Sequence, residues 1–144
     1  MIRGPVTNVL IIDDSEAARA AIASTLRVGG FGVFELSSAI GATRTILRNN
    51  IKVAIVDLSM PGLSGDKLVG LLRSNPRLAN LTVIVVSGQR GDDLAKIAKE
   101  CDVDGVLCKR DINVRLIPLL DSLLLSQSAT FRRGKLLANQ GGRD

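Results

Sequence analysis

Five polar residues of this sequence each follow an apolar run, and together they offer three carboxylates, one hydroxyl and one ammonium group. They are Asp13, Asp14, Asp57, Ser87 and Lys109. Clustered carboxylates repel one another unless a cation lies among them, and Mg²⁺ commonly binds through one or two carboxylates with water and phosphate. A carboxylate can also act as a nucleophile and form an aspartyl-phosphate. An ammonium and a hydroxyl then stabilise the charge on phosphoryl oxygens.

Taken singly, each of these residues has an ordinary structural explanation. The aspartates can belong to turns or cap loops, and Ser87 precedes a glycine as many turn serines do. Lys109 alone can be a solvated surface residue. Their occurrence at the ends of successive apolar runs is what favours one shared site over five separate explanations.

The residue types that are missing narrow the chemistry further. The chain has no histidine and two cysteines, Cys101 and Cys108, which excludes a Cys/His zinc site and a four-thiolate one. It also excludes a histidine general base or a histidine-containing catalytic triad. Both cysteines stand among apolar residues, so we expect small core side chains and not a redox pair.

The elements that position the five polar residues alternate regularly along the chain. We expect buried strands over residues 9–12, 31–36, 53–56, 81–86 and 106–108. We expect helices over 16–28, 39–47, after Ser64, from Asp92 onward, and over 114–125, with Ser38 and Ser64 as N-caps. Pro118 should bend or delay the last of these helices.

Apolar residues at helical spacing define the faces that should pack on the sheet. They are Ala18, Ile22 and Leu26; Leu68, Leu71 and Leu72; Leu94, Ile97 and Ala98; and Leu116, Leu119, Leu120 and Leu123. Strands alternating with helices predict an α/β fold, a doubly wound parallel sheet covered on both sides. Ligands of such sheets bind at the carboxyl ends of the strands, where the five polar residues stand.

Four stretches of the sequence resemble the receiver domain of bacterial two-component response regulators, of the stand-alone type. They are Val9-Leu10-Ile11-Ile12-Asp13-Asp14, Val56-Asp57-Leu58-Ser59-Met60-Pro61-Gly62, Val85-Val86-Ser87-Gly88 and Gly105-Val106-Leu107-Cys108-Lys109. Their order and separations also fit that family, and the resemblance covers roughly residues 7–125.

The resemblance implies a CheY-like, flavodoxin-like fold of five parallel strands in the order 2-1-3-4-5. It implies that Asp57 accepts a phosphoryl group from a histidine kinase or histidine phosphotransfer protein. Asp14, Asp57 and the backbone carbonyl of Ser59 would bind Mg²⁺, with Asp13 acting partly through water. Ser87 and Lys109 would bind the phosphoryl oxygens.

The family's output surface is the face formed by the fourth helix, fifth strand and fifth helix, which would contact a downstream protein. The chain departs from the family pattern at two positions there. Val106 replaces the aromatic residue that family members usually carry, and Arg110 replaces the proline that usually follows the lysine. Because a non-proline cis bond is costly, we expect a trans bond or a mildly strained cis bond after Lys109. A phospho-accepting signalling domain of this kind is not an enzyme acting on other substrates.

We expect one receiver domain over residues 1–125, as the resemblance implies, and a basic tail over 126–144 that is flexible or a helix extension. The net charge is +5, and the tail holds four basic residues against one acidic residue. We expect a cytoplasmic protein without a membrane span and without a DNA-binding domain.

Two alternative functions compete with the phosphorelay. In one, Arg132, Arg133 and Lys135 of the tail bind an anionic ligand, a nucleotide second messenger or an acidic partner. In the other, the chain is a phosphatase that resembles the haloacid dehalogenases, but their Asp-x-Asp motif is not met by Asp57-Leu58-Ser59.

Overall fold

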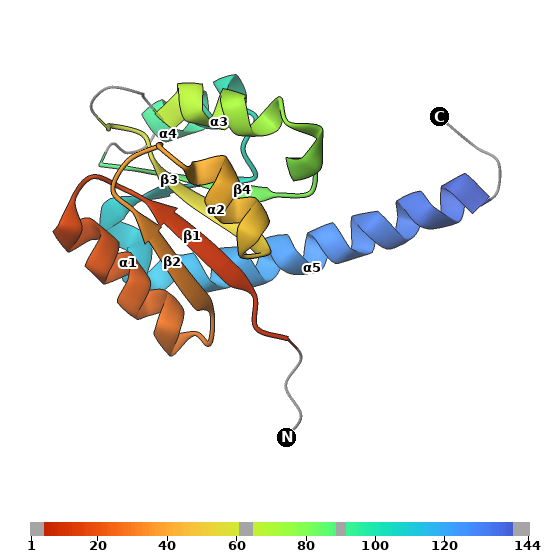
Figure 1. Cartoon of the computed structure of the whole chain (residues 1–144), viewed down its shortest axis with the longest axis horizontal. Helices are drawn as coiled ribbons and strands as arrows, with labels where there is room; N and C mark the ends of the chain where they lie inside the picture. Colours follow the sequence, from red (N-terminus) through yellow and green to blue (C-terminus); the bar gives the residue numbers. More distant parts are fainter. Residues whose placement is uncertain (1–4, 61–64, 89–91, 140–144) are drawn as a thin grey trace.

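The structure is a computed structural model that describes residues 5–60, 65–88 and 92–139, the side chains of residues 92–94, 98 and 127–139 excepted. It contains one all-parallel sheet of five strands in the order β2-β1-β3-β4-β5. The strands are β1 (Asn8–Ile12), β2 (Gly32–Leu36), β3 (Ile51–Asp57), β4 (Thr82–Ser87) and β5 (Gly105–Cys108). The expected fold class and strand order are confirmed (Figure 1).

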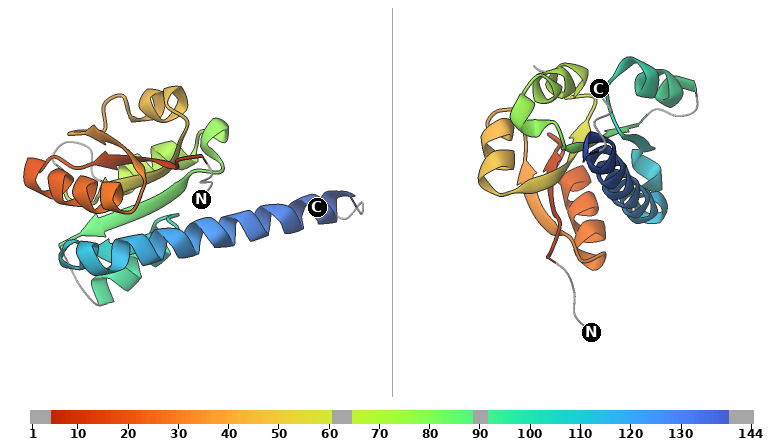
Figure 2. Two further views of the ribbon diagram at one scale, coloured as in Figure 1. Left: turned by 90° about the horizontal axis from the view of Figure 1, so that it is seen from below. Right: turned by 90° about the vertical axis from the view of Figure 1, so that its right-hand side faces the viewer.

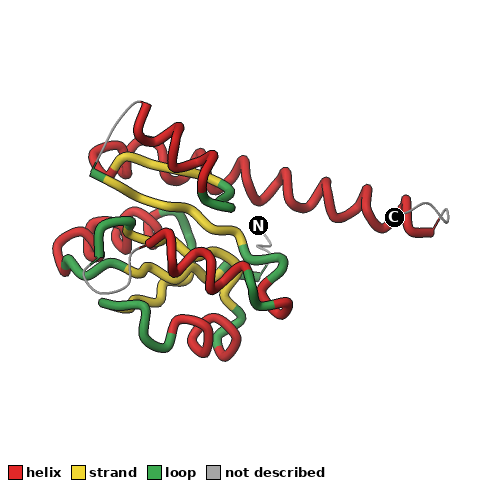
Figure 3. Tube along the Cα trace, turned by 90° about the horizontal axis from the view of Figure 1, so that it is seen from above, coloured by secondary structure: helices red, strands yellow, loops and turns green. Residues whose placement is uncertain are grey.

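Helices connect the strands and lie on both faces of the sheet, as the cartoon and the tube show (Figures 1 and 3). They are α1 (Glu16–Val28), α2 (Ala42–Arg48), α3 (Gly65–Arg73), α4 (Asp92–Glu100) and α5 (Ile112–Asn139), with short 3₁₀ turns η1 (Pro76–Leu78) and η2 (Lys109–Asp111). No helix within the described residues is long and apolar enough to cross a membrane.

Alternate residues of the central strands enter two separate cores, one on each face of the sheet. Leu10, Ala54 and Val85 belong to the core beneath α2 and α3. Their immediate neighbours in sequence enter the core that contains the buried residues of α1 and α5. Because side chains of a strand point alternately to opposite faces, a strand apolar at every position must be buried on both. The near-continuous apolar runs of the sequence therefore place the sheet in the middle of the molecule.

The second helix differs from its expected form at its beginning. It begins at Ala42, and Gly41, with a φ of 81°, stands in the N-cap position without a side-chain hydrogen bond. The prediction of Ser38 as the N-cap is wrong, because its hydroxyl accepts a hydrogen bond from the Ile40 amide in the preceding turn. A glycine adopts the left-handed conformation at little cost, so the chain turns at Gly41 before the helix starts.

The third helix presents a different face from the one predicted. Leu68, Val69 and Leu72 are buried, whereas 57% of Leu71 is exposed, so the assignment of Leu71 to the inner face is wrong. Two overlapping rows of apolar side chains run along this helix, and only one of them packs on the sheet. The predicted N-cap Ser64 lies outside the described part of the chain, and the description does not include the side chains of the predicted inner residues Leu94 and Ala98.

The fifth helix is longer than the expected 114–125. Leu116 and Leu120 are fully buried and Leu119 and Leu123 pack against the same core, as predicted. The helix continues through the exposed Pro118 and reaches Asn139. In the left view of Figure 2 it runs along the sheet and continues past it. The division of the chain at residue 125 stays a prediction.

The two leucines at the end of α3 provide a matched test of this packing. Leu72→Ala should lower the free energy of unfolding by about 2–5 kcal/mol. Leu72 is only 1% exposed, so the substitution leaves a cavity in the core. Leu71→Ala should change it by no more than about 0.5 kcal/mol. Urea unfolding followed by circular dichroism measures both values. Equal losses would show that α3 packs through a different face.

Candidate functional site

The carboxyl ends of four strands bring the predicted site residues to one edge of the sheet. Asp13 directly follows β1, Asp57 and Ser87 are the last residues of β3 and β4, and Lys109 directly follows β5. The strand register places Asp57 beside Val86, the residue before Ser87. Asp13, Asp57 and Ser87 are buried, with 0%, 2% and 1% of each residue exposed. Three of the buried polar or charged residues of the described chain therefore meet at this edge.

Asp13 is held by the backbone on one side and faces a charge on the other. Its amide donates a hydrogen bond to the carbonyl of Leu36, and its Oδ1 accepts one from the amide of Ser15 at 2.9 Å. Its Oδ2 is buried and has no hydrogen-bond partner among the described residues. Lys109 Nζ lies 3.0 Å from that oxygen, at ion-pair distance but without hydrogen-bond geometry.

Lys109 lies between two buried carboxylates. Its Nζ is 3.0 Å from Asp13 Oδ2 and 3.4 Å from Asp57 Oδ1. Burial by itself would lower the pKa of Lys109, but its contact with Asp13, and then with Asp57, outweighs that effect and raises the pKa. The lysine is therefore held in its charged form at the sheet edge.

The surroundings of Asp57 disfavour the ionised form of its carboxyl group. Burial raises its pKa above the ordinary 3.8, and the nearby charge of Asp13 raises it further. The amide of Ser59 donates a hydrogen bond to Oδ1 at 3.1 Å and, like Lys109, lowers the pKa without cancelling the rise. A cation bound beside Asp57 would offset the same cost.

The three aspartates fit a small hard cation. Asp13, Asp14 and Asp57 each place a carboxylate oxygen within 4.8 Å of the others, and Asp14 is exposed where Asp13 and Asp57 are buried. Asp13 Oδ2 is buried and has the Lys109 ammonium as its one close partner among the described residues, so it can also accept a metal or the water bound to a metal. Oxygen ligands of this number and charge suit Mg²⁺. The carbonyl of Ser59 as a fourth ligand stays a prediction, because the described contact of Ser59 is made by its amide.

Arg19 is a site residue that the sequence interpretation missed. From α1, its Nη1 donates a hydrogen bond to the backbone carbonyl of Asp13 at 2.8 Å, and its Nε lies 3.4 Å from Glu35 Oε1 on β2. Arg27 pairs with the other oxygen of Glu35 at 3.6 Å but does not contact Asp13. The available signal was a helical spacing, because Arg19 lies one turn after the N-cap Ser15 and so points back to the end of β1.

The two departures from the family pattern lie at β5. Val106 is partly buried and pairs with Val85 in the sheet. The described residues contain no cis peptide bond, so the bond between Lys109 and Arg110 is trans, one of the two expected forms, and Arg110 is exposed. Cys108 is buried, Cys101 is partly buried and both are free, so these two cysteines form no disulfide. The side chains of the predicted tail residues Arg132, Arg133 and Lys135 lie outside the description.

Comparison with known sequences identifies one family over most of the chain. Residues 9–120 match the response regulator receiver domain. A cyclic di-GMP phosphodiesterase of Thermotoga maritima is 31% identical over 112 residues, a match that covers 77% of this chain and 29% of that protein. The chemotaxis protein CheY of Pseudomonas aeruginosa is 29% identical over 102 residues, which cover 70% of this chain and 82% of CheY.

Solved structures agree with these sequence matches. A CheY-like receiver domain from Methylobacillus flagellatus has a TM-score of 0.72 and 29% identity, covering 83% of this chain and 99% of its own. A receiver domain of an HD domain-containing protein from Pseudomonas fluorescens has a TM-score of 0.75 at 17% identity, which shows the fold alone. Several of the sequence relatives are much longer than the chain, which spans 29%, 18% and 14% of the first three.

The cost of ionising Asp57 generates a prediction about stability. Since its pKa is raised in the folded state, the folded protein holds this proton more tightly than the unfolded chain does. Stability contributed by the group is therefore present below the unfolded pKa and is lost as the pH rises through the folded pKa. At pH 7 without metal, Asp57→Asn should raise the melting temperature, and Mg²⁺ should stabilise the natural protein more than the variant. Thermal melts in chelator and in Mg²⁺ measure this, with the exposed Asp121→Asn as control. A lower melting temperature for Asp57→Asn would contradict it.

The two arginines that share Glu35 allow a second matched test. Arg19→Gln should weaken Mg²⁺ binding by about tenfold or more, because groups that orient ligands commonly contribute that much to metal affinity. Arg27→Gln removes the other ion pair of Glu35 but no contact with Asp13, so it should leave the affinity unchanged. The chain has neither Trp nor Tyr, so titration calorimetry is the suitable measurement. Equal effects of both variants would assign the loss to Glu35 and not to the Asp13 carbonyl.

Proposed function

The chain belongs to the response regulator receiver domain family, and from that membership we propose that it receives a phosphoryl group on Asp57 in a phosphorelay. The observation that carries the proposal is the placement of Lys109 between Asp13 and Asp57, 3.0 and 3.4 Å from their oxygens. This placement puts a nucleophilic carboxylate, a fixed cation and a candidate metal ligand within one edge of the sheet.

The phosphoryl donor we propose is a phosphohistidine of a histidine kinase or histidine phosphotransfer protein. A carboxylate oxygen of Asp57 attacks phosphorus, the phosphorus–nitrogen bond breaks, and its electron pair returns to the imidazole, which takes up a proton. The product is an acyl phosphate on Asp57. Attack requires the ionised carboxylate, which Lys109 and the amide of Ser59 both favour.

Each of the other side chains has a defined part in this step. Lys109 is charged and lies beside Asp57, so it stabilises the charge on the transferring oxygens. Ser87 ends the strand next to β3 and can donate a hydrogen bond to one of those oxygens. Asp13, Asp14 and Asp57 would hold Mg²⁺, which when bound neutralises charge on the phosphoryl group.

The signal would leave through the surface formed by α4, β5 and α5, where we propose that a downstream protein binds. Val106 stands there in place of an aromatic ring, so the response cannot use the inward rotation of such a ring. A change at Lys109 reaches this surface directly, because Lys109 and Arg110 form η2 between β5 and α5. We therefore assign the coupling between site and surface to η2.

Intact mass spectrometry with Mg²⁺ and acetyl phosphate tests the phosphoryl transfer. The natural protein should gain the mass of one phosphoryl group, and Asp57→Asn should gain none. Lys109→Met should retain Mg²⁺ binding but accept phosphate far more slowly, because the charge beside the attacked phosphorus is lost. Lys99→Met, a change of charge at the last turn of α4, is the control and should behave as the natural protein.

Two results would contradict the proposal. One is the absence of an adduct in a protein that still binds Mg²⁺, and the other is an adduct that persists in Asp57→Asn. Beryllofluoride, which mimics an acyl phosphate without turnover, separates a slow reaction from an incompetent site, since it should bind to the natural protein and not to Asp57→Asn.

A further inference from the structure

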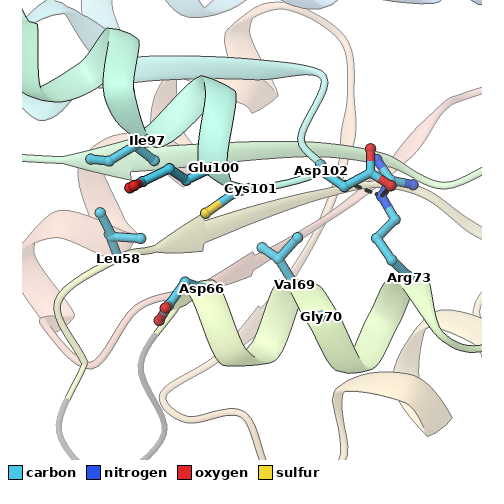
Figure 4. A pocket seen from close by; sticks show the side chains of 9 residues that line it. All are labelled: Leu58, Asp66, Val69, Gly70, Arg73, Ile97, Glu100, Cys101 and Asp102. Atoms are coloured by element: carbon cyan, nitrogen blue, oxygen red, sulfur yellow. Dashed lines mark hydrogen bonds and ion pairs between the residues drawn. The ribbon is translucent and has the colours of Figure 1, made fainter.

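A groove lies between α3 and α4, and its lining residues differ from those of the carboxylate site. It has a volume of about 420 Å³ and is half enclosed. Its walls come from Val69 and Gly70 on α3 and from Ile97 on α4, with Leu58 at one end (Figure 4). Leu58 and Ile97 pack against the core, so the apolar walls are fixed parts of the domain. None of the aspartates of the candidate metal site lines this groove.

Packing inside the protein does not explain why position 70 is a glycine. It lies within α3, where glycine is less favourable than alanine. A Cβ at this position would meet nothing within 4 Å, in contrast with Gly65, where it would lie 2.7 Å from the Asp57 carbonyl. The backbone conformation and the packing of α3 therefore do not require glycine at position 70. Glycine also occurs where a bound group approaches the backbone closely, and Gly70 faces the groove.

The polar lining of the groove is predominantly acidic. Asp66, Glu100 and Asp102 contribute three carboxylates, and Arg73 contributes the single cation among the described lining residues. Glu100 is exposed and makes no ion pair with any described residue. Burial raises the pKa of the Cys101 thiol between the helices, and the charges of Asp66 and Glu100 raise it further. The electrostatic potential in the groove is therefore negative.

Arg73 neutralises only part of this potential, because its Nε lies 3.9 Å from Asp102 Oδ2 but it makes no ion pair with Glu100 among the described residues. Its Nε donates to the carbonyl of Asp102 at 2.8 Å and its Nη1 to the carbonyl of Leu81 at 2.7 Å. Its Nη2 pairs with Asp104 Oδ2 at 2.7 Å. These bonds close one end of the groove and hold the start of β4 and the connection to β5 against α3. They leave the acidic end near Glu100 to an outside cation.

We propose that the groove between α3 and α4 is a docking site for a partner protein and receives a lysine or arginine from a basic, amphipathic segment of that partner. The aliphatic stem of such a side chain would lie against Leu58, Val69 and Ile97, and its charged end would meet Glu100. Charge complementarity selects a basic partner over an acidic one. The half-open shape allows a peptide backbone to pass over Gly70 while one side chain enters.

This surface shares α4 with the α4–β5–α5 face proposed for the downstream target, but its other wall is α3 and it does not include α5. The groove lies on the side of the sheet covered by α2 and α3, whereas the buried residues of α5 belong to the opposite core. A protein bound in the groove therefore leaves α5 uncovered. The proposal assigns a second partner site to the domain and does not depend on phosphorylation of Asp57.

Peptides selected from a random phage-displayed library on the immobilised full chain test the proposal, with affinities measured by titration calorimetry. We expect the selected peptides to carry Lys or Arg beside aliphatic residues. Gly70→Leu should weaken their binding by about tenfold or more, because a helical side chain leans toward the preceding turn and would fill the groove over Asp66. Glu100→Lys should weaken it similarly, since the charge that receives the cation is reversed.

Matched controls separate the groove from general effects. Gly70→Ala adds one methyl group in open space and should bind as the natural chain does. Asp121→Lys makes the same charge change as Glu100→Lys on the exposed side of α5 and should also leave binding unchanged. Thermal melts should show that Gly70→Leu is folded, because leucine favours a helix more than glycine does. In the natural protein, the amide chemical shifts of Val69, Gly70 and Cys101 should change when the selected peptide is added.

Three outcomes would overturn the proposal. They are equal binding by Gly70→Leu and the natural chain, selection of acidic peptides, and failure to select any peptide that shifts the groove amides. Butylammonium, an analogue of the lysine side chain, and butyrate, its anionic counterpart, supply a further arm. If butylammonium alone shifts these amides and no peptide does, the site takes a small organic cation and the protein partner is rejected.

Discussion

The like charges of Asp13 and Asp57 form the constraint on which the carboxyl edge of this sheet depends. Both carboxylates are buried, and one ammonium lies within 3.0 and 3.4 Å of their oxygens. Burial raises the pKa of Asp57, and because two anions share one cation, the charge of Asp13 raises it further. The electrostatic cost of ionising both aspartates therefore falls when a divalent cation binds, or when a new ligand changes the charge at this edge. A site with a complete set of internal partners would have no such response.

The surrounding structure maintains this arrangement through hydrogen bonds with the backbone, one of them donated by the guanidinium of Arg19. Asp13 is fixed by bonds to Leu36, Ser15 and Arg19, which come from β2, the turn after β1 and α1. Asp57 is fixed by the amide of Ser59 and by its place at the end of a strand buried on both faces. The two apolar cores thus supply the stability that the charged edge does not. The same layout allows the proposed phosphoryl transfer and the proposed docking in the groove between α3 and α4 to coexist. The carboxylate site uses a partly buried lysine among aspartates, and the groove has an acidic rim whose arginine, Arg73, is bound to the backbone of the β4 and β5 connections.

Particular residues show where sequence interpretation was sufficient and where it was not. Apolar runs identified every strand within one or two residues, and the five polar residues after them were correctly placed at one edge, because parallel strands direct their carboxyl ends to the same side. Leu71 and Val69 illustrate the failure. Both are apolar and adjacent stripes of α3 overlap, so only packing on the sheet determines that Val69 is buried and Leu71 exposed. Ser38 has the residue type of an N-cap, but the left-handed turn at Gly41 places the start of α2 after it.

The sequence by itself determined the fold class, the strand order through the family resemblance, and the set of side chains at the sheet edge. It could do so because burial of strands and the direction of parallel chains are local, repetitive properties that a pattern of apolar residues records. The tertiary structure alone decided that Arg19 holds the carbonyl of Asp13, that Arg73 is fully engaged, and that Gly70 opens onto an acidic groove. These features join residues of different elements, and their geometry depends on how helices sit against the sheet, which no single segment of the chain specifies.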